Sequence, residues 1–267
     1  MDIDKRNGNL AFNEENHLYW NINDNEKYIS VTTLIHRFTN EFDKEILNLY
    51  NISENDFNRE QQSILDAWDE ENRNSCERGT KIHADLENSF YKAGKNVSLQ
   101  RFGIGGKFEC KKDYSKLDLE YGVYPEYLIS RTSDDGILKI AGQVDLIVKS
   151  GNEITICDWK TNKKIEQKSF FNTKTKSSTK MKYPLNTLDD VNFYHYTLQL
   201  STYAWMLQKI NPNFIIKDLI LVHFDHQGNQ TIYHCDYLKD EVERMLYFYK
   251  KEVISERQKA KRKRIEY

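Results

Sequence analysis

The chain has 267 residues, a size that suits one α/β domain with an insertion or at most two small domains. Its 39 basic and 41 acidic residues give a formal net charge of −2, so only the location of charge, not its sum, can indicate nucleic-acid binding. No apolar run approaches the roughly 20 residues that a membrane-spanning helix needs, so we expect no membrane contact.

The first 55 residues are predicted to form a small unit that packs on the main domain. Residues 10–20 and 26–30 have the pattern of a β-hairpin, and a helix begins in residues 32–42. We therefore divide the chain into residues 1–55 and a main domain at 56–267.

The main domain opens with one or two helices over residues 56–93. Thr80 is a suitable N-cap for the second of them. His83 and Glu87 are four residues apart and so share a helix face. Apolar residues recur at helical spacing at Ile82, Leu86 and Phe90.

Three strands are predicted in the middle of the chain. Residues 98–120 contain several glycines, which favour a loop before a short helix. The strands follow at about 122–131, 137–149 and 153–160. Gly151-Asn152 is typical of a two-residue hairpin loop between the last two strands.

This hairpin places polar residues opposite one another. If Ser150 pairs with Glu153, then Asp145 lies opposite Asp158, and Gln143 lies opposite Lys160. Side chains alternate along a strand, so these four polar residues share one face. The core face is then formed by Val144, Leu146, Val148, Cys157 and Trp159.

Two opposed carboxylates need a positive partner. Two charges about 4 Å apart repel by about 4 kcal/mol at an effective dielectric constant near 20. A divalent cation bound by Asp145 and Asp158 offsets this repulsion, with the ammonium of Lys160 as a second positive group. The alternative is a solvated polar face on an edge hairpin, and the Asp-x-Lys spacing of Asp158 and Lys160 favours the cation site.

A basic insertion at residues 161–193 follows the last of these strands. Because it leaves directly from Lys160, we expect it to contact phosphates of DNA, with its aromatic rings stacked on unpaired bases. A solvated loop is the alternative, and the basic residues 257–264 are expected to give a weaker, non-specific phosphate contact. The candidate DNA-binding lysines are Lys163, Lys164, Lys168, Lys174, Lys176, Lys180 and Lys182, interleaved with Phe170, Phe171 and Tyr183.

The last part of the chain completes an α/β (α+β) fold with a central mixed β-sheet flanked by helices. A strong helical pattern over residues 194–207 sets Gln199 and Tyr203 one turn apart, where both can reach a phosphate oxygen or a water. Residues 219–224 and 230–237 predict a late hairpin, and residues 239–261 a terminal basic helix.

The order of these motifs resembles a known family. Asp145 followed by Asp158-Trp159-Lys160 is similar to the core of the PD-(D/E)XK nuclease superfamily, although the usual proline before the first aspartate is absent. Gly79-x-x-x-His83 and Gln199-x-x-x-Tyr203 resemble two motifs of its RecB-like and phage exonuclease branch. The mitochondrial genome maintenance exonuclease and the CRISPR-associated RecB-like exonucleases are more distant members. The resemblance implies a restriction-endonuclease-like core.

The resemblance also implies roles for the site residues. His83, Asp145, Asp158 and the backbone carbonyl of Trp159 are the expected ligands of Mg²⁺, and an imidazole ligand makes Mn²⁺ competitive. The catalytic set is then Asp145, Asp158, Lys160, Gln199 and Tyr203.

Two glutamates are accessory candidates. Many relatives carry a glutamate at the position of Glu126, on the strand before the hairpin. An ion pair between Glu126 and Lys160 or another basic neighbour is equally open. Glu87 is the second candidate, on the face of His83.

The cysteines bear on cofactor and compartment. Several relatives hold an iron–sulfur cluster with four cysteines, three of them close together near the C-terminus. Here the four cysteines are scattered, so we expect no iron–sulfur cluster. Isolated cysteines and an acidic, polar N-terminus favour a cytoplasmic protein that is not secreted, in the host cytoplasm if it is phage-encoded.

The expected function is a metal-dependent DNA exonuclease that acts on single-stranded or duplex ends, in phage recombination, replication or end processing. One alternative is a structure-selective endonuclease or resolvase on the same core. The other is a non-catalytic nucleic-acid-binding module.

Overall fold

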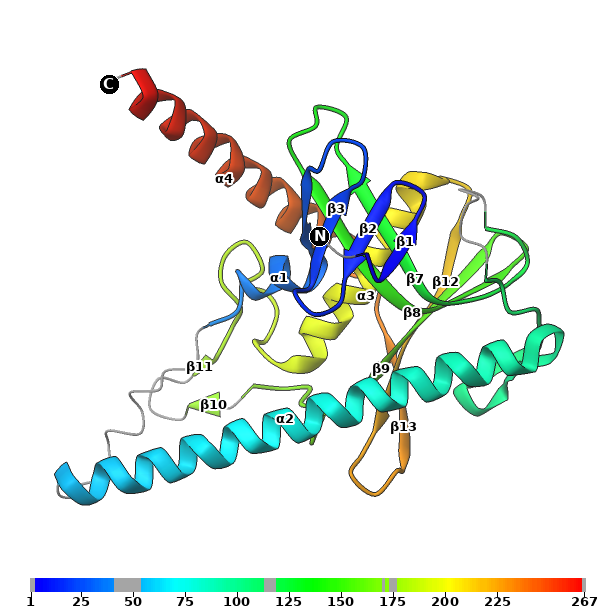
Figure 1. Ribbon diagram of the computed structural model, residues 1–267, viewed down its shortest axis with the longest axis horizontal. Coiled ribbons are helices and arrows are strands. Elements are labelled where there is room, and N and C mark those ends of the chain that lie inside the picture. The colour runs from blue at the N-terminus through cyan, green and yellow to red at the C-terminus, as the bar shows by residue number, and fades with distance from the viewer. Residues whose placement is uncertain (1–2, 41–53, 113–118, 170, 173–176, 266–267) are drawn as a thin grey trace.

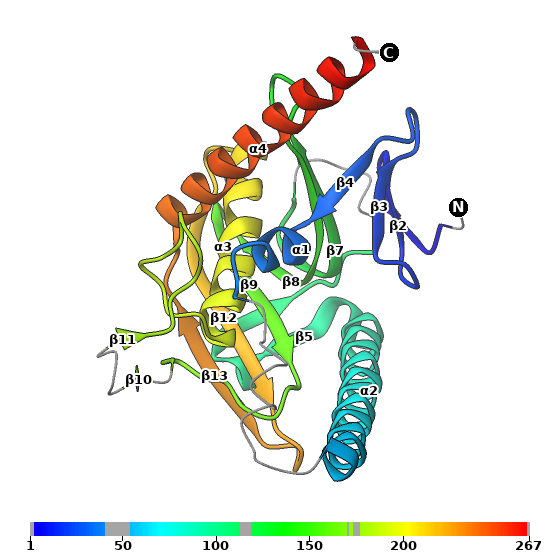
Figure 2. The same cartoon turned by 90° about the vertical axis from the view of Figure 1, so that its left-hand side faces the viewer.

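The computed structural model describes residues 3–40, 54–112, 119–169, 171–172 and 177–265. Within these ranges, a nine-stranded mixed sheet lies between helices on both faces (Figures 1 and 2). The α/β fold with a central mixed sheet flanked by helices is therefore confirmed.

The N-terminal strands form a meander rather than one hairpin. It contains β1 (Lys5–Asn7), β2 (Leu10–Asn13), β3 (Leu18–Asn21) and β4 (Lys27–Ser30), paired antiparallel in chain order. The helix predicted at 32–42 is the shorter α1 (Val31–His36), which Ser30 caps by accepting a hydrogen bond from the backbone N–H of Thr33. Residues 41 and 42 lie outside the described ranges.

The three central strands are confirmed as β7 (Gly122–Thr132), β8 (Lys139–Ser150) and β9 (Glu153–Lys160). Gly151 adopts a φ of 61° in the turn between β8 and β9, a conformation that glycine reaches without a Cβ penalty. The chain then crosses through α3 (Asn192–Ile210) to β12 (Ile215–Phe224), which runs parallel to β9. The late hairpin is confirmed by β13 (Gln230–Cys235), antiparallel to β12.

The sheet contains a fork at β8. Strand β7 pairs along the length of β8, so the other two neighbours of β8 share its opposite edge. On that edge β4 pairs with Ile140 and Ala141, and β9 pairs with Leu146–Ser150. The strands β4 and β9 therefore part over the stretch from Gly142 to Asp145.

The flanking helices are α2 (Glu54–Ala93) on one face and α3 with α4 (Lys239–Ile265) on the other (Figure 2). The segment predicted as one or two helices is thus a single helix, and Thr80 is not an N-cap. Thr80 lies inside α2, where its hydroxyl donates to the backbone carbonyl of Cys76, a hydrogen bond that helix interiors offer to threonine.

The short helix expected within residues 98–120 is wrong for the described part of that segment. It forms a small hairpin of β5 (Val97–Leu99) and β6 (Ile104–Phe108), with the 3-10 turns Gly94–Asn96 and Gln100–Phe102 beside them. Gly103, with a φ of 79°, reverses the chain there. The basic segment holds two further short strands, β10 (Phe171–Asn172) and β11 (Ser177–Ser178).

The apolar core has one layer on each face of the sheet. Leu146, Val148, Cys157 and Trp159 pack toward α2, as predicted. Val144 instead packs toward α3, which corrects its predicted face. The change of face coincides with a gap in the β7–β8 ladder between the pairs Tyr127–Val144 and Pro125–Leu146, where Glu126 of β7 has a positive φ of 52°.

Among the described residues, the helices are too short or too polar to span a bilayer.

Candidate active site at the fork of the sheet

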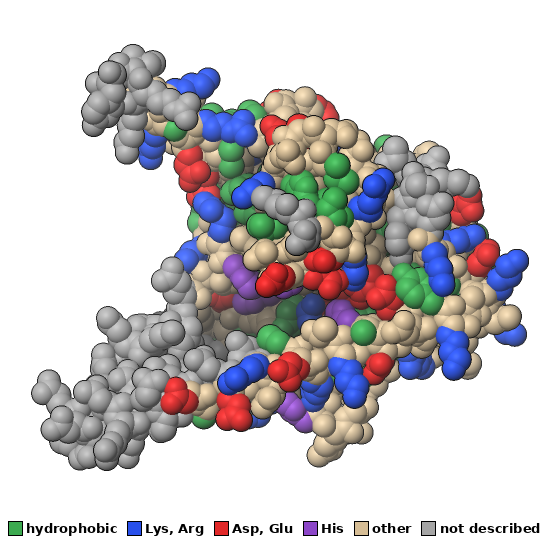
Figure 3. Space-filling model, viewed as in Figure 1, with side chains coloured by type: hydrophobic (Ala, Val, Ile, Leu, Met, Phe, Trp, Pro, Cys, Tyr) green, Lys and Arg blue, Asp and Glu red, His purple; other side chains and the backbone are tan. Residues whose placement is uncertain are grey.

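A pocket of about 230 Å³ lies at the fork. Figure 3 shows acidic and histidine side chains gathered along a hollow between α2 and the body of the molecule. The pocket draws its walls from the N-terminal meander, the start of α1, and α2, β7, β8 and α3. Its lining comprises Phe12, His17, Tyr19, Ser30, Val31, Thr32, His83, Glu126, Gly142, Gln143, Asp145, Gln199 and Tyr203.

Three potential metal ligands meet in this pocket. His83 Nδ1 lies 3.4 Å from Glu126 Oε1 and 3.7 Å from Asp145 Oδ1. One ligand atom from each of the three residues lies within 4.8 Å of the other two. The other ring nitrogen of His83, Nε2, is 3.2 Å from the backbone carbonyl oxygen of Trp159. One ring nitrogen of His83 therefore faces the carboxylates of β7 and β8, and the other faces the predicted carbonyl on β9.

The position of Glu126 depends on its backbone. Register places it opposite Asp145, and its left-handed φ of 52° departs from the strand there. Its Oε2 accepts a hydrogen bond from Gln143 and lies 3.8 Å from Lys5 Nζ. The basic neighbour of Glu126 is thus Lys5, from β1.

A second polar chain runs from β9 to α3. Lys160 Nζ lies 2.6 Å from Asp158 Oδ2 and donates to Gln199 Oε1 at 3.5 Å. Gln199 in turn donates to the hydroxyl of Tyr203 at 3.3 Å. The ring of Tyr196 covers Lys160, with Nζ 4.7 Å from the ring centroid. The structure thus brings all four predicted residues of this chain together.

The hairpin register is confirmed from Ser150–Glu153 to Leu146–Cys157. Beyond that pair, Asp145 Oδ2 accepts a hydrogen bond of 2.7 Å from the backbone N–H of Trp159. A side-chain bond therefore ties β8 to β9 where the ladder ends, and it leaves Asp145 Oδ1 directed at His83.

The carboxylates are buried together, which changes their proton affinity. Burial raises the pKa of Asp158 to about 6, with repulsion from Asp145 adding to it and Lys160 opposing it. Burial also raises the pKa of Asp145, against the attraction of His83. Burial disfavours the protonated ring of His83, but Asp145 and Glu126 outweigh it and raise its pKa to about 9. The carboxylates of the site therefore repel one another, and protonated His83 and Lys160 are the cations that offset this repulsion.

This cluster of carboxylates fits a divalent cation. Glu126 Oε1 and Asp158 Oδ1 are buried and lack a hydrogen-bond partner within the described structure. Such an oxygen is costly unless an unseen ligand satisfies it. Carboxylate, imidazole and carbonyl donors together form a set that Mg²⁺ or Mn²⁺ accepts.

Two glycines permit the close approach of these elements. A Cβ on Gly142 would lie 2.5 Å from Cε1 of Tyr203, so only glycine lets α3 approach the fork this closely. A Cβ on Gly79 would lie 3.1 Å from Oγ1 of Thr161, where α2 crosses the end of β9. The glycine four residues before His83 is therefore a packing position.

Several residues that form the site were not predicted from the sequence. Tyr19 and Lys5 come from the meander, whose docking at the fork depends on the fold of the whole chain. Gly142 could have been noticed as a small residue three positions before Asp145. Glu87 lies apart from the ligand group and accepts a hydrogen bond of 3.0 Å from the hydroxyl of Tyr91.

The basic segment is partly described. Lys163, Lys164 and Lys168 are exposed, as are Lys180 and Lys182. Lys180 is paired with Asp189 at 2.6 Å, and Lys164 with Glu166 at 2.7 Å. Lys174, Lys176 and Phe170 lie outside the described residues, and the exposed rings are Phe171 and Tyr183.

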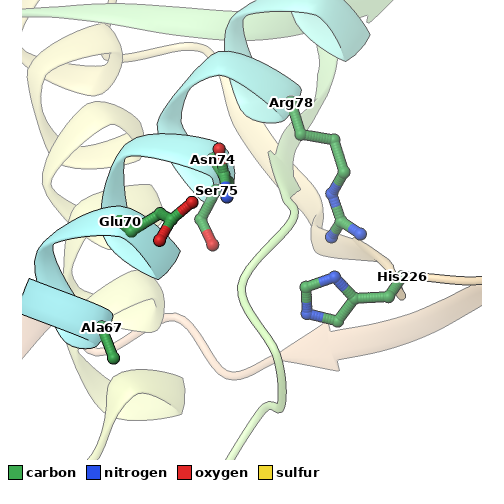
Figure 4. Close-up of a pocket in the computed structure, with 6 residues that line it drawn as sticks. All are labelled: Ala67, Glu70, Asn74, Ser75, Arg78 and His226. Atoms are coloured by element: carbon green, nitrogen blue, oxygen red, sulfur yellow. The ribbon is translucent and has the colours of Figure 1, made fainter. Parts of the chain in front are cut away.

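A larger pocket of about 390 Å³ lies upstream on α2 and contains none of the predicted residues (Figure 4). Arg78 and His226 face one another across it from α2 and the turn after β12. Arg78 donates to the backbone carbonyls of Thr161 and Phe224, so its role here is to fasten α2 to the ends of β9 and β12.

Comparison with known proteins identifies the family. A model of the PD-(D/E)XK nuclease superfamily matches residues 33–265. No curated protein matches the sequence significantly. The crystal structure of SSO0001 is 17% identical, with a TM-score of 0.40, and the match covers 86% of this chain and 76% of that one. A putative exonuclease from Eubacterium rectale is 12% identical, with a TM-score of 0.36, covering 85% of this chain and 80% of that one.

The matched region contains His83, strands β7 to β9 and the Lys160–Tyr203 chain, whereas β4 lies before it. The protein belongs to the PD-(D/E)XK nuclease superfamily, whose members are hydrolytic nucleases that act on nucleic acids with divalent metal ions.

Proposed function

We propose that the protein is a Mg²⁺- or Mn²⁺-dependent deoxyribonuclease that degrades DNA from an end, as in the RecB-like branch. The observation that carries the proposal is the convergence of His83, Glu126 and Asp145 next to the Asp158–Lys160 pair. A non-catalytic binding module has no need for a buried cluster of carboxylates with unsatisfied oxygens.

We assign the cation to His83, Glu126 and Asp145. Asp158 is paired with Lys160, and the Trp159 carbonyl lies at the other ring nitrogen of His83, so their roles as ligands stay predictions. A bound divalent ion supplies Lewis-acid activation of water and offsets negative charge on the phosphate. Glu126 thus moves from an accessory candidate to a full member of the set, because its Oε1 is both near His83 and unsatisfied.

The residues of α3 and β9 orient the substrate in this proposal. Lys160 presents its ammonium next to Asp158, where it can stabilise charge on a scissile phosphate or hold the attacking water. Gln199 and Tyr203 fix the position of Lys160 through their hydrogen-bond chain.

The N-terminal meander supports end-dependent cleavage. Phe12, His17 and Tyr19 line the pocket beside the proposed metal ligands, so we expect them to limit the path of a strand that enters it. A strand terminus suits such a pocket better than the middle of a continuous duplex. The role in phage recombination or replication rests on the sequence resemblance alone and stays a prediction.

The test is a cleavage assay on end-labelled linear DNA with Mg²⁺, Mn²⁺ or EDTA. We expect metal-dependent release of nucleotides by the wild type and none by Lys160→Ala or Asp158→Ala. Lys217→Ala, which removes an exposed lysine paired with Glu153 at 2.5 Å, is the matched control and should keep full activity.

Closed circular DNA separates exonuclease from endonuclease, since a strict exonuclease leaves it intact. Cleavage of the circle would replace our proposal with the endonuclease alternative. Wild-type turnover by Lys160→Ala would remove the proposed site, and the absence of any metal-dependent product would favour the binding module.

A further inference from the structure

Another pocket lies at the C-terminal end of α1, whose N-terminal end lines the fork pocket. Its volume is about 320 Å³, and it is formed by the end of α1, the Lys182-Tyr183 segment and α4. Val31 and Thr32 at the start of α1 line the fork pocket, whereas His36 at its end lines this one. The two pockets therefore lie at opposite ends of α1, whose six residues span about 9 Å.

An aromatic ring is presented at this pocket. Tyr183 is 68% exposed, the largest exposure among the large hydrophobic side chains of the described residues. It meets Phe248 of α4 edge to face, with ring centroids 5.5 Å apart, and Phe248 in turn meets Phe38 at 6.0 Å. Tyr183 is therefore held at one side by an aromatic cluster while most of its surface stays in solvent.

The charges at the pocket suit a phosphate. Lys182 is exposed next to Tyr183, and His36 is exposed at the end of α1. The acidic residue of the lining, Glu252, is neutralised by Arg37 at 3.1 Å. The net charge of the lining is therefore positive, through Lys182.

The pocket is also well anchored. The backbone N–H of Lys182 donates to the carbonyl of Phe38 at 2.7 Å, which ties the basic segment to α1. Asn40 donates to the side chain of Asp190 and to the carbonyl of Lys180, a further link between the same two segments. Tyr183 consequently needs little reordering to receive a ligand.

We propose that this pocket binds one unpaired nucleotide of single-stranded DNA, with its base stacked on Tyr183 and its phosphate near Lys182. A platform of this kind tolerates any base and adds to the affinity of a strand whose end lies in the fork pocket. The proposal rests on the proposed function for the identity of the ligand as DNA.

The test is the equilibrium binding of a fluorescent single-stranded oligonucleotide in EDTA, where no cleavage intervenes. Tyr183→Ala should weaken binding at least fivefold, because base stacking on an aromatic ring contributes about 1–3 kcal/mol. Tyr247→Ala is the matched control, since Tyr247 is 62% exposed on the same helix as Phe248 but does not line the pocket. It should bind as the wild type does.

Two further measurements make the proposal specific. Lys182→Gln should lower the slope of log K against log salt concentration by the amount that corresponds to about one phosphate contact. An abasic nucleotide moved along the strand should weaken wild-type binding at one position, and Tyr183→Ala should be insensitive there.

Wild-type affinity in Tyr183→Ala would overturn the proposal, as would an equal loss for fully duplex blunt-ended DNA. Because the assay requires no metal, its result is independent of cleavage. A nuclease test that fails while the Tyr183 effect persists would remove the proposed enzyme activity and leave the nucleotide site.

Discussion

At Gly142 the absence of a side chain decides how closely α3 approaches the fork of the sheet. A Cβ at this position would lie 2.5 Å from Cε1 and 2.8 Å from the hydroxyl of Tyr203. Tyr203 is 2% exposed and therefore has little room to move away.

We expect Gly142→Ala to displace Tyr203 and break its hydrogen bond with Gln199, so that Lys160 loses its support. Overpacking of this kind typically costs about 1–3 kcal/mol of stability. Nuclease activity should fall at least tenfold, or about 1.4 kcal/mol in activation free energy. Gly105→Ala is the control, because nothing lies within 4 Å of its Cβ position. Unchanged initial rates in Gly142→Ala would show that the position of Tyr203 does not matter.

At the scale of residues, the sequence indicated which side chains lie near one another better than it indicated their individual contacts. The two-residue turn fixes the register of the hairpin as far as Leu146–Cys157. The predicted pairing of Asp145 with Asp158 lies beyond the ladder, where Asp145 instead accepts a hydrogen bond from the backbone of Trp159. Glu126 was ranked lower because its orientation depends on a left-handed backbone at a non-glycine position, which no local pattern indicates. The catalytic roles of these residues stay predictions.

At the scale of elements, α2 can position His83 at the site only if the middle of the helix is fixed against the sheet. The guanidinium of Arg78 binds the carbonyls of Thr161 and Phe224, at the ends of β9 and β12. Because Gly79 and His83 follow on the same helix, this link determines the distance between His83 and the strands.

Arg78→Leu should therefore weaken both stability and metal binding. Two carbonyls lose a charged donor, and an unsatisfied polar group costs about 1–3 kcal/mol. Urea unfolding and Mn²⁺ titration measure the two effects. Arg73→Leu, at an exposed position one turn and a half earlier in α2, is the control and should change neither. If Arg78→Leu bound Mn²⁺ as tightly as the wild type, the helix would not need this anchor.

The elements differ in how far local sequence determines them. The central hairpin and α3 follow from turn chemistry and periodicity, which act over a few residues. The fork does not, because it requires β4 to pair with the edge of β8 more than 100 positions later. The continuation of α2 through Thr80 was also missed, since a threonine that suits a cap can equally donate to a carbonyl within a helix.

At the scale of the whole molecule, the site gathers residues from β1, α2, β7, β8, β9 and α3. A ligand bound there would contact elements that lie on both faces of the sheet. Any ligand that binds the folded chain and not the unfolded one stabilises it by mass action. At a concentration of Mn²⁺ about 100 times its dissociation constant, this stabilisation amounts to about 2.7 kcal/mol.

Thermal unfolding with and without Mn²⁺ tests which residues hold the ion. For a chain of this size, about 2.7 kcal/mol corresponds to a rise in Tm of about 5–10 °C. We expect this rise in the wild type and its loss in His83→Ala, Glu126→Gln and Asp145→Asn, because each removes one ligand atom of the group.

Glu87→Gln is the discriminating control in this series. Glu87 shares the helix face of His83 but is bonded to Tyr91 and lies outside the ligand group, so its variant should keep the full rise. A rise that survives in Glu126→Gln but disappears in Glu87→Gln would reverse the two assignments, and the ion would then bind on α2 rather than between the strands. Since the readout is stability, the result holds whatever substrate the enzyme prefers.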